Sequence, residues 1–138
     1  MIELRFPGGV QVEAVFDGFS VLTDQPASAG GQGKAPSPVD LFLASVAACA
    51  GFYALRFCQE RGLPTAGLRV AMETERDEAH KRTARLRIGI TLPEDFPDKY
   101  RAALLRAVNQ CAVKRQLEDP PAFELAIAPV PEPALAIV

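Results

Sequence analysis

The chain has 138 residues, of which 49% are apolar and 23% are charged, and this balance is typical of one globular domain spanning residues 1–138. The net charge of −2 and the scattered Lys and Arg residues provide no basic patch, which argues against nucleic-acid binding. The first residues do not have the pattern of a signal peptide, and three cysteines do not make a secreted disulfide framework, so we expect a cytoplasmic protein.

Alternating apolar and polar residues predict three strands at the start of the chain, over residues 2–6, 10–16 and 19–22. Turn signals separate them, Pro7-Gly8-Gly9 first and Asp17-Gly18 second. A loop rich in Gly, Ala, Pro and Ser follows over residues 24–37. Loops of this length in a compact domain are often functional.

A long helix is predicted over residues 38–61, with clear signals at both ends. Ser37 is the expected N-cap, Pro38 takes the first helical position and Asp40 completes a capping box. Gly62 followed by Pro64 marks the end. Residues 41–55 are apolar nearly all round but too short for a membrane span, so we expect a buried helix and no membrane contact. One chain is too small to cover such a helix, and we expect a second subunit to help.

A hairpin of longer strands is predicted over residues 68–73 and 84–90, with its turn near Glu78-Ala79. Pairing through that turn would place Met72 opposite Leu86 and Glu73 opposite Arg85. The many charges between residues 73 and 87 then belong to a solvated sheet face.

The last third of the chain predicts two helices and one strand. The first helix covers residues 96–108, a break follows at Asn109-Gln110, and a short helix covers residues 111–117. Asp119-Pro120-Pro121 ends that helix, residues 123–128 read as a final strand, and the proline-containing tail from residue 129 is expected to be extended.

Two of the three cysteines are candidates for chemistry. Cys49 lies near the middle of the long helix, with Ser45 and Tyr53 one turn away on either side and Arg56 two turns away. Cys111 begins the short helix, a position that can depress a thiol pKa. Both could equally be inert buried thiols. Cys58 points to the opposite face from Cys49 and is taken as structural.

Other types of site find little support in the sequence. His80, the single histidine, lies at the predicted hairpin turn, which is a poor position for a catalytic triad. No spacing typical of metal ligands is present, so neither a metal nor another cofactor is expected. The glycine-rich stretch before Lys34 lacks the full phosphate-binding pattern.

The segment from Gly33 to Cys49 resembles the signature of the OsmC and organic hydroperoxide resistance family. That signature is a glycine-rich loop, a Ser/Asn-Pro step, here Ser37-Pro38, and an apolar helix with a cysteine eleven residues after the proline. Cys111, with the Ala-Val-Lys that follows it, matches the second family cysteine. The order of elements also fits, so the resemblance covers nearly the whole chain.

The resemblance implies an α+β fold with antiparallel sheets around a long buried central helix. It also implies an intertwined homodimer with two sites at the subunit interface. The implied chemistry is that of a thiol peroxidase, in which Cys49 attacks a small-molecule hydroperoxide and becomes a sulfenic acid. Cys111 would then form a disulfide with it, which a dithiol reductant reopens.

Two positions depart from the peroxidase pattern. Peroxidases of the family have a glutamate directly after the helix-starting proline, where this chain has Val39. They also have an arginine in or after the N-terminal strands, whereas no arginine lies between Arg5 and Arg56 here. Lys34, Arg56 and Tyr53 are therefore the candidates for stabilising the thiolate or binding substrate.

These departures leave more than one function open. The first hypothesis is a peroxidase that uses Cys49 and Cys111 as its redox pair. The second is a non-enzymatic dimer that binds an apolar or thiol ligand at its interface. A thiol-dependent acyl or sulfur-transfer role is a third.

Overall fold

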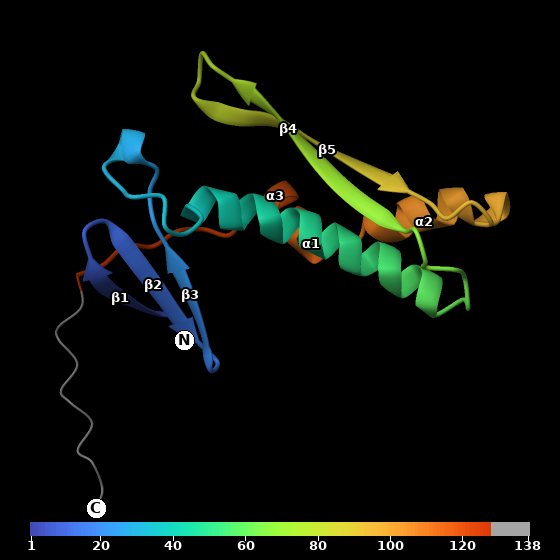
Figure 1. The fold of residues 1–138 in the computed structure, drawn as a ribbon, viewed down its shortest axis with the longest axis horizontal. Helices are drawn as coiled ribbons and strands as arrows, with labels where there is room; N and C mark the ends of the chain where they lie inside the picture. Colours follow the sequence, from blue (N-terminus) through green and yellow to red (C-terminus); the bar gives the residue numbers. More distant parts are fainter. Residues whose placement is uncertain (128–138) are drawn as a thin grey trace, which may run out of the picture.

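The computed structural model describes residues 1–127, which form a mixed α+β fold with two antiparallel sheets and one long helix (Figure 1). The three strands at the start are confirmed as β1 (Glu3–Gly8), β2 (Gln11–Phe16) and β3 (Phe19–Thr23), paired in that order. The turns between them use Gly9 and Gly18 at positive φ, a conformation that glycine adopts without steric cost.

The loop after β3 is organised around the buried carboxylate of Asp24, which is only 2% exposed. Its oxygens accept hydrogen bonds from the backbone N–H groups of Gln25, Gln32 and Lys34, at 2.8, 3.2 and 3.0 Å. The loop also contains a short 3₁₀ turn, η1 (Ala27–Ala29). Asp24 therefore gives a defined shape to a segment that has little regular structure.

The long helix α1 (Pro38–Gln59) begins as predicted. Ser37 and Asp40 form the capping box, in which the Ser37 side chain accepts from the Asp40 N–H and the Asp40 carboxylate accepts from the Ser37 N–H. The helix ends two residues earlier than predicted, where Gly62 adopts a φ of +60° and the Leu63 N–H bonds to the Cys58 carbonyl. That bond terminates the helix in the manner of a glycine C-cap.

The predicted hairpin is present as β4 (Arg69–Asp77) and β5 (Arg82–Thr91), but its predicted register is wrong by two residues. Met72 pairs with Ile88 rather than Leu86, and Glu73 pairs with Arg87 rather than Arg85. The four-residue turn, with Lys81 at a φ of +50°, and a bulge after Glu75 account for the shift. A shift of two keeps every side chain on its predicted face.

The end of the described chain differs more from the prediction. The predicted helix over residues 96–108 starts later, as the 3₁₀ turn η2 (Asp98–Tyr100) and then α2 (Arg101–Val108), because Pro97 disfavours helical backbone at Phe96. The break at Asn109-Gln110 and the short helix α3 (Ala112–Glu118) are confirmed.

The predicted last strand is wrong over residues 123–127, which have no regular structure, while residue 128 and the tail lie outside the described residues. Phe123, Leu125 and Ile127 are at least 88% exposed. A strand needs a neighbouring strand to bond to, and none lies beside this segment in the described part of the single chain.

One hydrophobic core lies where α1 packs against α2 and the β4–β5 hairpin. It is formed on the α1 side by one helix face, namely Ala50, Ala54, Phe57 and Cys58. The expectation that α1 is buried nearly all round is wrong for a single chain, since Phe52 and Leu55 on its other side are 53% and 40% exposed. The cause is that α2, α3 and β4 all lie on one side of the helix.

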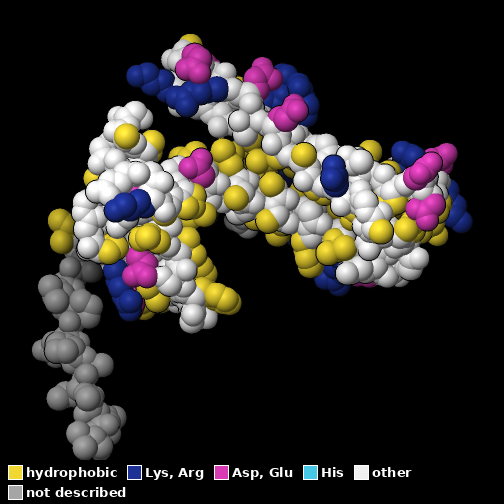
Figure 2. Space-filling model, in the orientation of Figure 1, with side chains coloured by type: hydrophobic (Ala, Val, Ile, Leu, Met, Phe, Trp, Pro, Cys, Tyr) yellow, Lys and Arg dark blue, Asp and Glu magenta, His cyan; other side chains and the backbone are white. Residues whose placement is uncertain are grey.

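Hydrophobic side chains also cover the N-terminal sheet and the middle of α1 in the view of Figure 2, whereas charges gather on the β4–β5 hairpin and at the far end of α1 and α2. By length and composition alone α1 could cross a membrane, although 28% of its most apolar window is buried within this chain. A core helix of a soluble protein can pass the same test of length and composition.

Candidate active site

The fold brings Cys49 and Cys111 together, although 61 positions separate them in the sequence. Cys49 lies on α1, and Cys111 is the N-cap of α3, which packs against α1. The Cys111 thiol lies close enough to Cys49 to lower its pKa. Both sulfurs are free thiols, with Cys49 half-buried and Cys111 only 2% exposed. The two sulfurs therefore form one site in which they can act on each other.

The pKa of Cys49 is lowered by its surroundings. Burial by itself would raise this pKa, but four groups that favour the thiolate outweigh it. They are the Cys111 thiol, the backbone N–H groups of Val113 and Ala112, and the positive charge of Arg115. Because the thiolate is the reactive form of cysteine, Cys49 is the better nucleophile of the two.

The pKa of Cys111 is raised, first by burial and then by the neighbouring Cys49. The expected depression at a helix N-terminus is therefore wrong for Cys111, although its Sγ does accept the Lys114 N–H at 3.5 Å. The N–H groups of the first turn of α3 stabilise Cys49 instead. The raised pKa favours the protonated form of Cys111.

Arg115 is the site residue that sequence reasoning missed. It lies one helical turn after Cys111, and this i to i+4 spacing on one helix face was a signal visible in the sequence. Its guanidinium makes no ion pair within residues 1–127. Arg115 is therefore free to hold negative charge near the sulfur pair.

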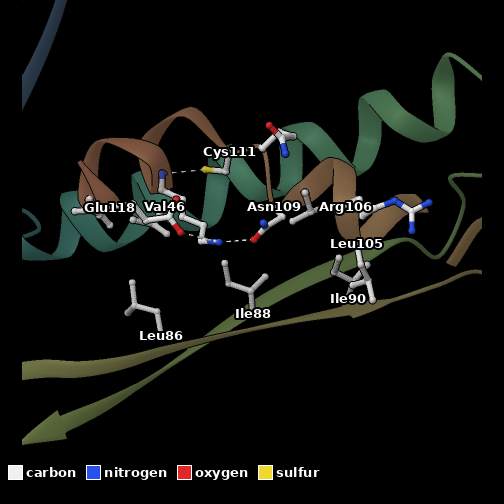
Figure 3. A pocket seen from close by; sticks show the side chains of 13 residues that line it. Val46, Leu86, Ile88, Ile90, Leu105, Arg106, Asn109, Cys111 and Glu118 are labelled. Carbon is white, nitrogen blue, oxygen red and sulfur yellow. Dashed lines mark hydrogen bonds and ion pairs between the residues drawn. The ribbon is translucent and has the colours of Figure 1, made fainter. Parts of the chain in front are cut away.

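A cavity of about 780 Å³ opens beside Cys111, between β5 and the two helices α2 and α3 (Figure 3). Leu86, Ile88 and Ile90 line it from β5 and point toward the helices. The polar lining residues come from α2, α3 and the break between them, and the amine of Lys114 is held by the Asn109 side chain and by Glu118. The remaining lining residues are Val46, Leu105, Arg106, Val108, Gln110 and Leu117. The cavity suits an apolar organic group.

The three auxiliary candidates lie elsewhere in the structure. Lys34 lines a small cavity of about 120 Å³ beside Asp24, near the turn between β1 and β2. Tyr53 and Arg56 line a groove between α1 and α2, where Arg56 forms an ion pair with Glu60 at 2.7 Å. None of the three is among the groups that shift the pKa of Cys49.

The other titratable residues considered lie outside the sulfur site. Cys58 is fully buried and burial raises its pKa, as expected of a structural thiol. His80 is exposed at the β4–β5 turn and pairs with Asp77 at 2.7 Å. Within residues 1–127 no group of three His, Cys, Asp or Glu side chains is arranged to hold a metal ion.

Comparisons with known proteins point in one direction. A family model described as OsmC-like protein matches residues 31–126. A structure of a putative osmotic stress induced and detoxification response protein from Psychrobacter arcticus 273-4 superimposes with a TM-score of 0.71 and 21% identity, over 83% of this chain and 85% of that one. A search of curated protein sequences finds no match.

Two further solved structures have the same fold. An OsmC like protein from Mycoplasma pneumoniae gives a TM-score of 0.69 at 14% identity, over 87% of each chain. A hypothetical protein from Aquifex aeolicus VF5 gives 0.66 at 17% identity, also over 87% of each chain. At these sequence identities, the similarity shows that the chains share a fold and nothing more.

Proposed function

Because the chain belongs to the OsmC-like protein family, we propose that it is a thiol peroxidase that reduces organic hydroperoxides through Cys49 and Cys111. One observation carries the proposal: the two thiols lie side by side where α3 packs against α1, and their pKa values are shifted in opposite directions. A low-pKa nucleophile beside a protonated second thiol is the arrangement that two-cysteine peroxide reduction needs.

The proposed reaction starts with attack of the Cys49 thiolate on the outer oxygen of the hydroperoxide. The O–O bond breaks, Cys49 becomes a sulfenic acid, and the leaving alkoxide takes up a proton to give the alcohol. Cys111 then attacks the Cys49 sulfur; its own proton leaves with the displaced hydroxide as water, and a disulfide forms. A dithiol reductant returns both sulfurs to thiols.

Arg115 and the backbone N–H groups of Ala112 and Val113 replace the family arginine, which is missing between Arg5 and Arg56 in this chain. They favour the Cys49 thiolate before reaction. The same positive groups favour the negative charge that develops on the departing oxygen. In this proposal Arg115 replaces the earlier candidates Lys34, Arg56 and Tyr53, which lie against other partners.

The apolar cavity favours a hydroperoxide with a bulky organic group over hydrogen peroxide. Such a group would lie against Ile88 and Leu105, with its peroxide end toward Cys111 and the neighbouring Cys49. The same cavity also favours a second candidate function, namely binding of an apolar ligand without turnover.

Turnover of the single-site variants separates the two functions. We expect Cys49→Ser to lose reduction of cumene hydroperoxide in the presence of dithiothreitol, while Cys58→Ser, the matched control on the same helix, keeps it. Unchanged peroxide consumption by Cys49→Ser would reject the peroxidase. If the protein does not consume the hydroperoxide but changes the fluorescence of an apolar probe in a saturable way, the binding function is favoured.

We also propose that the working form is a cytoplasmic homodimer. Three free thiols suit a reducing compartment. The apolar face of the N-terminal sheet and the outer face of α1 are open to solvent, and a second copy of the chain is the occupant that would cover both at once. The exposed apolar residues are Leu4, Phe6 and Phe19 in the sheet and Phe52 and Leu55 on the outer face of α1, while Val39 and Phe42 add apolar surface in its first two turns.

A further inference from the structure

We propose that the sulfur pair is also the N-terminal cap of α3, and that closing the Cys49–Cys111 disulfide removes this cap, frays α3 and opens the buried site to the reductant. The inference rests on the proposed function for its natural oxidant, the hydroperoxide. The switch itself needs only the disulfide, so it can be tested without any peroxidase activity.

The capping is seen in the hydrogen bonds of the first turn. The first N–H groups of any helix have no partner within the helix and must find one outside it. In α3 the Lys114 N–H donates to Cys111 Sγ at 3.5 Å, and the N–H groups of Ala112 and Val113 act on Cys49. Cys111 Sγ therefore accepts one N–H group of this turn (Figure 3), and the N–H groups of the other two residues lie near enough to Cys49 to lower its pKa.

Apart from this cap, α3 is held mainly by its packing against α1 and by the contacts of Lys114. The helix has only seven residues, and none of them is buried. Helices this short are unstable in isolation and depend on their caps and on packing. Pro120-Pro121 follows the C-terminal end. Fraying is therefore expected to begin at the N-terminal turn, next to the sulfurs.

Disulfide formation changes what the sulfurs can accept. The two thiols together give up two electrons and two protons, and the hydroperoxide that receives them becomes an alcohol and water. The negative charge that Cys49 carries as a thiolate, which favours a helix N-terminus, is lost. Cys111 Sγ must also come within about 2.05 Å of the Cys49 sulfur, which draws it away from the Lys114 N–H.

The switch answers a need of the catalytic cycle. The thiolate of a dithiol reductant has to approach one sulfur of the disulfide along the S–S axis, but Cys111 is only 2% exposed in the reduced protein. The residues of α3 that would move, Lys114, Leu117 and Glu118, also form one wall of the cavity beside Cys111. Fraying of α3 would therefore uncover the disulfide and widen the cavity in one event.

Hydrogen exchange measured by mass spectrometry tests the switch in the full chain. The Cys58→Ser variant is compared in its reduced form and after oxidation by diamide, which takes two electrons and two protons from the thiol pair. Non-reducing peptide mapping identifies the bond. We expect exchange over residues 112–118 to be roughly fivefold faster in the oxidised form, as for the loss of one helix cap. Exchange in α2 (Arg101–Val108) should not change.

Limited trypsin digestion gives a second measure, because Lys114 and Arg115 lie in α3 whereas Arg101 and Arg106 lie in α2. In the oxidised form, cleavage should rise after Lys114 and Arg115 but not after Arg101 or Arg106. Cys111→Ser, whose hydroxyl can still cap the helix but cannot form a disulfide, should show no response to diamide. Equal exchange over residues 112–118 in both states, failure of diamide to link Cys49 to Cys111, or an equal loss of protection in α2 would each overturn the proposal.

Discussion

The thiol of Cys111 lowers the pKa of the neighbouring Cys49, whereas Cys49 raises the pKa of Cys111. A pair of equivalent buried thiols would have no preferred nucleophile. Here the first turn of α3 breaks the symmetry, because its N–H groups and Arg115 act on Cys49 while Cys111 remains protonated. The division of labour between the two sulfurs thus follows from where one short helix begins.

The pH dependence of Cys49 alkylation should reveal this asymmetry. In Cys58→Ser, we expect the rate of iodoacetamide reaction at Cys49, followed by mass spectrometry, to rise with a midpoint below the ~8.5 of a free cysteine. Arg115→Ala should raise that midpoint, because it removes a nearby positive charge. Arg106→Ala is the control on the neighbouring helix. A midpoint at or above that of free cysteine would contradict the lowered pKa.

Filling the cavity should change substrate preference. Ile88→Trp places a large side chain in the space beside Cys111, and we expect turnover of cumene hydroperoxide to fall about tenfold while turnover of hydrogen peroxide is kept. Arg87→Trp adds the same side chain on the opposite face of β5 and serves as the control. Equal losses for both peroxides in Ile88→Trp would mean that the cavity does not hold the organic group.

The loop after β3 should depend on the charge of Asp24. Backbone N–H groups, that of Lys34 first, lower the pKa of this carboxyl group. The ionised form therefore stabilises the fold fully above the unfolded pKa of ~3.9, and this contribution is lost as pH falls toward the lower folded value. We expect Asp24→Asn to melt at lower temperature than the parent at pH 7, with the difference shrinking below pH 4. Asp17→Asn, in the exposed β2–β3 turn, should melt like the parent at both pH values.

The proposed homodimer can be tested by its molecular mass in solution. Light scattering coupled to size exclusion should give twice the mass of one chain. Phe52→Glu, on the outer face of α1, should shift the protein toward the monomer because a charge cannot be buried there without a partner. Gln59→Glu adds the same charge at the end of the same helix and should leave the mass unchanged. A monomeric parent protein at micromolar concentration would reject the dimer.

Local signals in the sequence predicted much of the fold. Ser37, Pro38 and Asp40 identified the start of α1 because capping chemistry is contained in four consecutive residues. The register of the β4–β5 hairpin was missed because it depends on the turn, where Lys81 adopts a positive φ, and on a bulge after Glu75. Neither feature has a strong sequence signature.

The site was predictable in its members but not in its electrostatics. Cys49 and Cys111 came from the resemblance to a family and not from any local pattern, since each is one thiol among apolar residues. The contribution of the backbone N–H groups of Ala112 and Val113 could not be foreseen, because it depends on how α3 packs against α1. The spacing of Arg115 from Cys111 was visible in the sequence. Its effect on the pKa of Cys49 could not be predicted, because it requires Cys49 to lie beside that turn of α3.

The open apolar face of the N-terminal sheet has a consequence for how the protein behaves in solution. For the proposed dimer, part of the free energy of folding comes from contacts between two chains, so mass action enters the stability. The melting temperature is then a function of protein concentration and rises as the solution is made more concentrated. In a cell, the amount of the protein would help to set how long each copy stays folded.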